Sequence, residues 1–408
     1  MQNELQNLFP KQSEIPQEFD FKAEIHQREL LIDGEFLRWN GAVQEVFSPV
    51  HVETEKGLHP KLLGSFPMAT EKEALVALDA AVKAYDNGRG EWPTMTISER
   101  ISCMENFTNL MIQKKAKIVN LIMWEIGKTY ADSVKEFDRT VDYIHDTIDA
   151  LKETDREASR FVIEGGVIGQ IRRAPLGVVL CMGPFNYPLN ETYTLLIPAL
   201  LMGNTVLFKP PKHGSLLHYP LYEAFQKSFP KGVFNTVYGK GHSVIPPLMS
   251  SGKVNVLTLI GSRKVADSLK KMHPKVNRLR AILGLDAKNA AIVLPCADLD
   301  LAVKECVLGS LSFNGQRCTA IKIIFVHESV ANEFCRKFAH EVSKLKPGMP
   351  WEKGVQLTPL PEPGKPGFIK EVIDDAQANG ASVINEHGGE AFKSFVFPAV
   401  LFPVNDKM

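Results

Sequence analysis

The residue best suited to covalent chemistry is Cys318, which lies in the run SFNGQRCTA at 312–320. Its Gly-Gln-Arg-Cys turn stands directly before a β-rich run at 321–326. Asn186, in GPFNYP, stands far upstream, where a predicted strand breaks into a loop. A thiolate on a turn can attack a carbonyl carbon, and an amide N–H can hold the oxyanion that forms. The two residues therefore predict acyl-transfer chemistry, although a lone cysteine is more often a small buried hydrophobe.

The other cysteines are not arranged for chemistry. The six cysteines, at positions 103, 181, 296, 306, 318 and 335, include no Cys-x-x-Cys pair and no Cys/His cluster. This spacing favours free thiols in a reducing cytosol and predicts no metal site. Cys181, Cys296 and Cys306 lie in apolar patterns and are interpreted as core residues. Arg317 precedes Cys318, and its positive charge is expected to lower the pKa of the Cys318 thiol.

Length and charge exclude several functional classes. A chain of 408 residues suggests two or more domains. Lys+Arg and Asp+Glu both total 47, so the charge balance predicts neither a nucleic-acid nor a membrane partner. The N-terminus MQNELQNLFPKQSEIP lacks the basic start and apolar block of a secretory signal, and no apolar run approaches membrane-spanning length. We expect a cytoplasmic protein that acts on a small molecule.

The elements that must position Cys318 and Asn186 read as an α/β fold. From residue 177 apolar strands alternate with helices, which predicts a parallel sheet of βαβ units. The expected strands are 178–182, 205–208, 233–237 and 254–260, and the expected helices are 192–201 and 216–228. A second α/β block begins near Gly284, with a strand at 290–294 and a helix at 298–312.

Helices and a hairpin are expected upstream of this alternation. Thr70 and Glu73 form a capping-box pattern that predicts a helix start. Further helices are expected at 98–124 and 131–152, and residues 161–172 carry a hairpin signal around a Gly-Gly turn. The Pro/Gly-rich stretch at 359–367 is interpreted as a surface loop.

With their connecting segments, the two motifs resemble the aldehyde dehydrogenase superfamily over nearly the whole chain. The nearest likeness is to its NADP-dependent, non-phosphorylating glyceraldehyde-3-phosphate dehydrogenase branch. The resemblance implies an aldehyde dehydrogenase-like fold with a Rossmann-type cofactor domain, an α/β catalytic domain and an oligomerisation hairpin. The implied division is 1–157 (N-terminal part of the cofactor-binding domain), 158–173 (hairpin), 174–282 (Rossmann-type NADP-binding domain) and 283–408 (catalytic domain).

The same resemblance bears on the end of the chain and on assembly. The sequence stops at FPAVLFPVNDKM, whereas the family's catalytic domain continues well past this point. We therefore expect a protein whose C-terminal portion is missing. The full-length form is expected to be a homodimer or homotetramer.

Lys209 and Lys212 are the leading cofactor residues. GNTVLFKPPK at 203–212 places Lys209 at the C-terminal end of a strand, the edge at which ligands bind an open α/β sheet. The position alone favours an ordinary surface lysine, but the surrounding run resembles the one in which the family's lysine holds the adenosine ribose. Lys212 stands where NAD-preferring relatives commonly carry a glutamate, which implies a charge partner for the 2′-phosphate of NADP. NADP is the expected cofactor, and NAD is the alternative.

Two glycine turns complete the implied cofactor site. Gly239 and Gly241 do not form a full Rossmann fingerprint, because the last expected glycine is Val244. The family uses this turn to let the backbone approach the adenosine side. Gly261 and Ser262 resemble the family's Gly-Ser turn, whose N–H groups suit a pyrophosphate. Taken alone, each pair predicts only a turn.

Three further residues bear on the substrate. Arg139 lies on the predicted helix 131–152, on the face opposite its apolar stripe, so it is not expected in the core. Tyr187 follows Asn186, and Arg317 precedes Cys318. In the glyceraldehyde-3-phosphate branch the matching residues line the substrate phosphate pocket. The alternative is two solvated arginines and a packing tyrosine, but three matches together favour phosphate binding.

Gly284 departs from the family pattern. The family's general base is a glutamate in a Glu-Leu-Gly-Gly-Lys run, and the aligned segment here is Gly-Leu-Asp-Ala-Lys at 284–288. The carboxylate that would activate the hydrolytic water is therefore absent at this position, and thioester hydrolysis is expected to be slow. Asp286, two residues away, has a shorter reach and is a poor substitute.

The predicted function is NADP-dependent oxidation of a phosphorylated aldehyde through a Cys318 thioester, and the expected conversion is glyceraldehyde 3-phosphate to 3-phosphoglycerate. One alternative is a coenzyme A-acylating semialdehyde dehydrogenase, a superfamily branch that also lacks the glutamate. The other alternative is a non-catalytic or truncated scaffold. Product analysis with and without coenzyme A distinguishes the first, and NADP titration followed by a turnover assay distinguishes the second.

Overall fold

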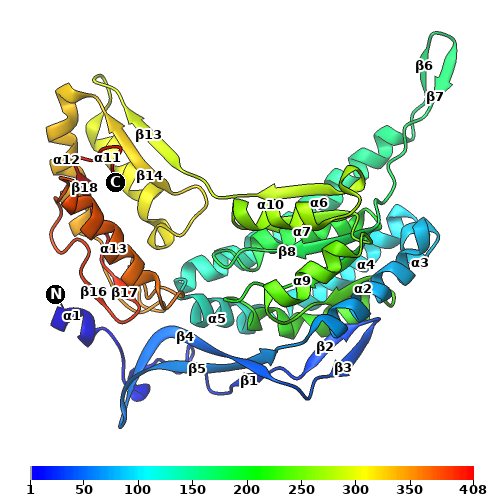
Figure 1. The fold of residues 1–408 in the computed structure, drawn as a ribbon, viewed down its shortest axis with the longest axis horizontal. Helices are drawn as coiled ribbons and strands as arrows, with labels where there is room; N and C mark the ends of the chain where they lie inside the picture. The colour runs from blue at the N-terminus through cyan, green and yellow to red at the C-terminus, as the bar shows by residue number, and fades with distance from the viewer. Residues whose placement is uncertain (1) are drawn as a thin grey trace.

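A five-stranded parallel sheet forms the centre of the larger part of the molecule (Figure 1). The computed structural model describes residues 2–408. The strand order is β10-β9-β8-β11-β12, and each neighbouring pair is parallel. The strands are β8 (Val178–Met182), β9 (Thr205–Lys209), β10 (Phe234–Thr236), β11 (Val256–Ile260) and β12 (Arg280–Gly284). All five residues of β8 are buried, as expected for a strand covered on both faces. The predicted α/β alternation is confirmed.

Helices connect these strands and cover the sheet. α7 (Asn190–Leu201) packs on β8, β9 and β11, and α2 (Glu71–Tyr85) packs on β8, β9 and β10. Right-handed crossovers place α7, which follows β8, on the same face of the sheet as η3 (Leu216–Leu221) and α8 (Tyr222–Ser228), which follow β9. They place α9 (Gly241–Ser250), after β10, and α10 (Arg263–Met272), after β11, on the other face. The strand order reverses between β8 and β11, so a crevice for ligands is expected at their carboxyl ends.

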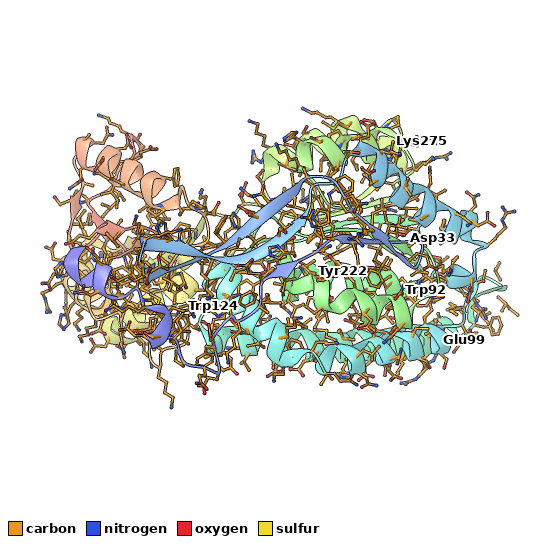
Figure 2. All side chains as sticks on the ribbon, turned by 90° about the horizontal axis from the view of Figure 1, so that it is seen from below. Asp33, Trp92, Glu99, Trp124, Tyr222 and Lys275 are labelled. Atoms are coloured by element: carbon orange, nitrogen blue, oxygen red, sulfur yellow. The ribbon has the colours of Figure 1, made fainter. Side chains whose placement is uncertain are left out.

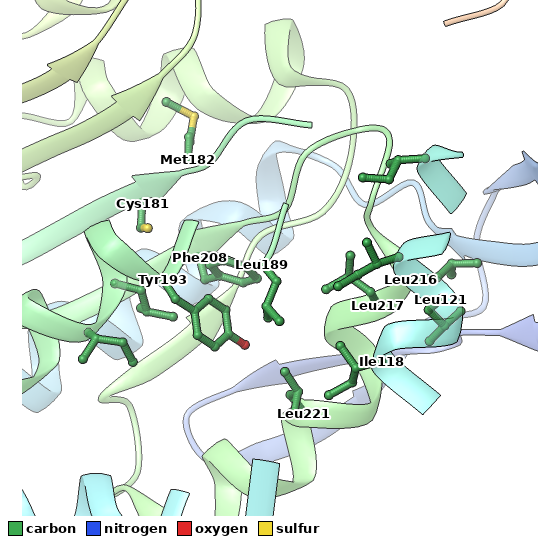
Figure 3. Close-up of a cluster of buried hydrophobic side chains, with 14 of the residues drawn as sticks. Ile118, Leu121, Cys181, Met182, Leu189, Tyr193, Phe208, Leu216, Leu217 and Leu221 are labelled. Atoms are coloured by element: carbon green, nitrogen blue, oxygen red, sulfur yellow. The ribbon is translucent and has the colours of Figure 1, made fainter. Parts of the chain in front are cut away.

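Apolar packing fixes the loops that leave this sheet. Figure 3 shows Cys181, Tyr193 and Phe208, from β8, α7 and β9, in the same buried hydrophobic cluster as Ile118 and Leu217. All five side chains are fully buried. Figure 2 marks Trp92, Trp124 and Tyr222, which are also buried. A core of this density holds the carboxyl ends of β8 and β9 at fixed positions.

The N-terminal part wraps around the sheet domain. Long antiparallel strands β4 (Val43–Thr54) and β5 (Gly57–Pro67) run beneath it (Figure 1). Thr70 caps α2 in a capping box with Glu73, as predicted. The single helix expected at 98–124 is two helices, separated at residues 113–114. The remaining elements are α1 (Gln2–Asn7), β1 (Ile25–His26), β2 (Glu29–Ile32), β3 (Glu35–Arg38), α3 (Glu91–Thr94), α4 (Ile97–Ile112), α5 (Lys115–Ile126) and α6 (Tyr130–Ala158).

The predicted hairpin is present and projects from the body (Figure 1). β6 (Val162–Glu164) pairs antiparallel with β7 (Val167–Gly169) across a turn with two left-handed glycines. Its apolar side chains face outward, with Ile163 72% and Ile168 66% exposed.

The second α/β block lies beside the sheet domain (Figure 1). β13 (Asn289–Val293) and β14 (Ile321–Val326) form a parallel pair, joined by α11 (Leu299–Leu311). The stretch at 359–367 is a loop only in part, because α13 begins at Lys365. The other elements are α12 (Glu328–Ser343), α13 (Lys365–Ala378), β15 (Ser382–Val383), β16 (Ala391–Phe392), β17 (Phe395–Val396) and β18 (Leu401–Phe402). Within residues 2–408 no helix is both long and apolar enough to cross a membrane.

Candidate active site

The turn that carries Cys318 connects α11 to β14. It begins with residues Ser312–Gly315, in which Phe313 and Asn314 adopt left-handed φ angles of 52° and 54°. The Asn314 side chain anchors this turn by donating from Nδ2 to the Thr358 carbonyl at 3.0 Å. Cys318 follows in the exposed part of the turn. The thiol is therefore accessible, as the chemistry requires.

The oxyanion candidate Asn186 meets this turn from the other part of the molecule. It lies in the loop after β8, and its residue is 8% exposed. Its Nδ2 donates to the backbone carbonyl of Gln316 at 2.6 Å, and its Oδ1 accepts the Tyr187 N–H at 3.1 Å. The structure thus brings Asn186 and the Cys318 turn together, as predicted. An amide N–H held here can stabilise negative charge on a carbonyl oxygen.

A buried ion pair, which the sequence analysis missed, fixes the Asn186 loop. Lys128 Nζ donates to Glu136 Oε2 and, at 2.8 Å, to the Asn186 carbonyl, and both charged side chains are fully buried. Glu136 Oε1 accepts the backbone N–H groups of Leu189 and Asn190 at 3.0 and 3.1 Å. Burial is the largest influence on Lys128 and lowers its pKa. Helical spacing could have indicated that Glu136 is buried, because it lies on the same face of α6 as Phe137 and Thr140.

The Lys128 ammonium also packs against two rings. Its Nζ lies 3.6 Å from the centre of the Tyr187 ring and 4.5 Å from that of Phe313. Phe313 belongs to the Cys318 turn, and Tyr187 belongs to the Asn186 loop. Because both rings contact one buried cation, the two loops share a common support.

Glu191, also missed, faces the nucleophile. It lies in the first turn of α7, and its Oε1 is 3.8 Å from Cys318 Sγ, within reach of a weak S–H···O hydrogen bond. Burial raises the pKa of the Glu191 carboxyl, which the Cys318 hydrogen bond opposes. The sequence could have indicated Glu191, because it is a carboxylate in the helix that directly follows the Asn186 loop.

The expected lowering of the Cys318 pKa is wrong. Burial raises the pKa of the thiol, and the negative charge of Glu191 and the hydrogen bond with it act in the same direction. The backbone N–H groups of Cys318 and Thr319 oppose this rise. The Arg317 guanidinium donates instead to Ser312 Oγ at 3.1 Å. The thiol therefore faces a carboxylate rather than a cation.

The three predicted substrate residues are linked to the site by their electrostatic effects. Arg139 is exposed on α6, as its helical phase predicted, and its charge lowers the pKa of Glu191 against the larger effect of burial. Burial raises the pKa of Tyr187 to about 12, and the positive charge of Arg317 opposes that rise. Arg139 therefore acts on Glu191, and Arg317 acts on Tyr187 of the Asn186 loop.

The predicted adenosine-side residues gather in one cavity of about 280 Å³. Lys209 and Lys212 line it from the end of β9, and Gly239 and Gly241 line it from the turn after β10. Burial lowers the pKa of Lys209 to about 8, and its Nζ donates to the Pro210 carbonyl at 3.1 Å. Gly239 has a φ of +117°, and a Cβ there would lie 2.3 Å from the Ala69 carbonyl oxygen, so only glycine fits.

Glu125 shapes the loop between Lys209 and η3. Its fully buried carboxylate accepts the backbone N–H groups of Ser215 and Leu216, at 2.5 and 3.1 Å. Burial raises the Glu125 pKa to about 7 in spite of these bonds. The cavity wall is thus held from inside the protein, as a preformed ligand site requires.

Gly261 and Ser262 lie at the next strand end, outside the lining of this cavity. Ser262 caps α10, with its Oγ accepting the Val265 N–H at 3.4 Å. Asp286 Oδ2 accepts the Arg263 N–H at 3.2 Å, so a carboxylate already stands at this helix N-terminus. Gly284 ends β12 beside β11, and its carbonyl accepts the Gly261 N–H at 2.9 Å.

The interpretation of the other cysteines is correct in two cases and wrong in one. Cys181 and Cys306 are buried, as expected. Cys296 is exposed. Its apolar pattern misled because the strand β13 ends at Val293, so Cys296 falls in the turn before α11 rather than in the core.

Comparison with known proteins identifies the family of this chain. The model of the aldehyde dehydrogenase family matches residues 48–408. An NADP-dependent glyceraldehyde-3-phosphate dehydrogenase of Streptococcus equinus is 33% identical over 334 residues, covering 79% of this chain and 67% of the relative. A lactaldehyde dehydrogenase of Methanococcus aeolicus is 26% identical over 355 residues, covering 86% of this chain and 74% of the relative.

Solved structures agree as well. The crystal structure of an NADP-dependent glyceraldehyde-3-phosphate dehydrogenase from Bacillus halodurans, complexed with NADP, superposes with a TM-score of 0.84 and 31% identity. The match covers 94% of this chain and 78% of that one. With the family model matching most of the sequence, the chain belongs to the aldehyde dehydrogenase family, the NAD(P)-dependent oxidoreductases that act on aldehyde groups.

Proposed function

We propose that this protein oxidises a small phosphorylated aldehyde with NADP, converting glyceraldehyde 3-phosphate to 3-phosphoglycerate through a thioester on Cys318. The observation that carries the proposal is the junction of two loops, in which Asn186 Nδ2 is hydrogen-bonded to the Cys318 turn at Gln316. This contact supports the pairing of an amide donor with the exposed Cys318 thiol two residues further on. Relatives named for the same reaction, with about 30% identity, add to this support.

Two residues are assigned to the first step, the attack on the aldehyde. The Cys318 sulfur attacks the aldehyde carbon, and the Asn186 amide donates to the oxygen that becomes negative. Bound NADP supplies a hydride acceptor, and loss of the hydride leaves an acyl group on Cys318. Water or another nucleophile then releases the acid. Lys128 holds the Asn186 carbonyl, so the donor stays oriented throughout.

The cavity of about 280 Å³ beside β9 fits the adenosine end of the cofactor. It offers a glycine turn that admits close backbone approach and two lysines that can contact ribose and phosphate oxygens. Lys212 is exposed at its rim, where a positive charge can meet a 2′-phosphate. This arrangement favours NADP over NAD.

The phosphate end of the substrate is assigned to Arg139, Tyr187 and Arg317. Arg317 acts electrostatically on Tyr187, and Arg139 acts on Glu191, which supports this assignment. A phosphate can accept hydrogen bonds from both guanidinium groups and from the phenol.

Gly284 supports a second candidate, the acylation of coenzyme A. In the family pattern this position carries the carboxylate that activates water, and here it carries none. A thiol acceptor would then release the acyl group. The two candidates differ only in the last step.

The hairpin and the cysteines suggest assembly and location. The outward apolar side chains of β6 and β7 suit an interface, so we propose a homodimer or homotetramer. The six cysteines are unpaired, which fits a reducing cytoplasm. We also propose that the domains end at residues 157, 173 and 282, which separates the N-terminal part, the hairpin, the NADP-binding domain and the catalytic domain.

The test is a product assay. The chain is incubated with glyceraldehyde 3-phosphate and either NADP or NAD, with and without coenzyme A, and NADPH and acid are measured. Formation of 3-phosphoglycerate with NADP alone supports the first candidate. A requirement for coenzyme A supports the second. Equal rates with neutral propanal would contradict the phosphate assignment.

A further inference from the structure

Glu191 raises a question that the family pattern does not answer. Without a carboxylate at Gly284, a group must accept the proton of the Cys318 thiol and, later, a proton of the attacking water. Glu191 is the carboxylate whose Oε1 lies 3.8 Å from Cys318 Sγ. It belongs to the first turn of α7, whereas Gly284 ends β12.

We propose that Glu191 is the general base of this site, first for the Cys318 thiol and then for the water that hydrolyses the thioester. The proposal rests on the proposed function, because it assigns a role within that reaction. It makes Glu191 a catalytic residue, since its oxygen contacts a reacting atom.

The position of Glu191 is fixed by its surroundings. The loop before α7 is locked by Glu136, which binds the N–H groups of Leu189 and Asn190 directly before Glu191. Thr194 Oγ1 donates to the Glu191 carbonyl at 2.7 Å, which steadies this first turn. The carboxyl is half-buried, so it keeps access to solvent for the exchange of protons.

The charges around Glu191 and Cys318 suit a general base at Glu191. Glu191 faces Cys318, and its pKa is also acted on by Glu136, Lys128 and Arg139. On the thiol side, burial and the positive charge of Lys288 lower the pKa of Lys322, and the charge of Cys318 opposes this change. Burial raises the pKa of both the Glu191 carboxyl and the Cys318 thiol. A carboxylate with a raised pKa is a stronger proton acceptor, which suits a general base. Formation of the S–C bond makes that transfer favourable, because the thiol becomes acidic as it attacks.

The proton balance closes over the cycle. As the S–C bond forms, the C=O electron pair moves to oxygen and the S–H proton moves to Glu191. When the hydride leaves the carbon, for which bound NADP would be the acceptor, the oxyanion electron pair re-forms the C=O bond of the thioester, and Glu191 returns its proton to solvent. Water then adds to the thioester carbon and gives one proton to Glu191, the C–S bond breaks, and Glu191 reprotonates the leaving thiolate. The acid product ionises to a carboxylate and releases its proton to solvent.

The test uses p-nitrophenyl acetate, which acylates a cysteine without NADP or a phosphorylated aldehyde. The chain and its Glu191→Gln variant are acetylated, if necessary at raised pH, and decay of the acetyl-Cys318 peptide is followed by mass spectrometry. Loss of a positioned base should slow this decay by about 10²- to 10⁴-fold. Glu191→Asp should fall between them. Glu153→Gln, an exposed glutamate on the same long helix as Arg139, is the matched control and should decay like the parent.

Two pH profiles complete the test. Parent deacylation should rise through the titration of a carboxyl and then level off, whereas Glu191→Gln should follow hydroxide alone. The alkylation of Cys318 by iodoacetamide should shift to lower pH in Glu191→Gln, because a negative neighbour is removed. Equal deacylation rates overturn the proposal, and so does an unshifted alkylation profile. Failure to oxidise glyceraldehyde 3-phosphate would instead count against the proposed function and leave these readouts intact.

Discussion

The buried Lys128–Glu136 pair allows a quantitative prediction. Lys128→Met removes a cation whose side chain is fully buried and leaves the Glu136 carboxylate without its charge partner. Breaking such a pair typically costs about 3–5 kcal/mol, because the remaining charge is buried and uncompensated. The folded-to-unfolded ratio should therefore fall by about 10²- to 10⁴-fold. The Asn186 carbonyl also loses its donor, so acylation of Cys318 should slow.

A double variant tests the reason for this loss. In Lys128→Met/Glu136→Gln, the neutral amide oxygen can still accept the N–H groups of Leu189 and Asn190, and no charge remains. The double variant should therefore recover most of the stability lost in Lys128→Met. Urea unfolding of the parent, both single variants and the double variant completes the cycle.

A surface lysine on α6 supplies the control. Lys152 is paired with Asp149 and exposed, so Lys152→Met should change stability by no more than about 0.5 kcal/mol. A cost below about 1 kcal/mol for Lys128→Met would refute the reasoning. So would a double variant that loses the sum of the two single effects, because the stranded charge would then not be the cause.

The remaining predictions concern the catalytic and cofactor sites. Cys318→Ser should abolish dehydrogenase activity while NADP affinity, measured by fluorescence titration, stays the same; an active variant would mean another nucleophile. Lys212→Glu should shift preference from NADP toward NAD by about 1.5–3 kcal/mol, one to two decades in Kd, and equal use of both cofactors by the parent would remove its basis. Arg139→Ala should slow phosphorylated aldehydes far more than propanal, and an equal loss for both would assign it a structural role. Gly284→Glu should speed thioester hydrolysis beyond the rate that Glu191 alone supports, provided Ile260 moves slightly, because a Cβ at 284 would lie 3.1 Å from its Cγ1; an unchanged turnover rate would show that hydrolysis does not limit the reaction.

Local sequence sufficed for most elements and for proposing a nucleophile. The apolar runs of β8 and β9, the Thr70 capping box and the Gly-Gly turn of the hairpin each carry their own signal, because strand burial, helix capping and tight turns depend on neighbouring residues. Cys318 and Asn186 could be identified for the same reason, since each stands in a short motif. The strand-end positions of Lys209 and Gly239 followed from the βαβ alternation.

Tertiary structure alone decided the electrostatics of the site. Arg317 is adjacent to Cys318 in sequence, yet its guanidinium turns to Ser312, while Glu191 faces the sulfur from α7. The direction of the thiol pKa was therefore wrong from sequence, because a pKa depends on burial and on charges brought near in space. The Lys128–Glu136 pair was missed for the same reason. Lys128 contacts the Asn186 loop and the Cys318 turn, and these two segments meet only when the sheet domain and the second α/β block fold against each other.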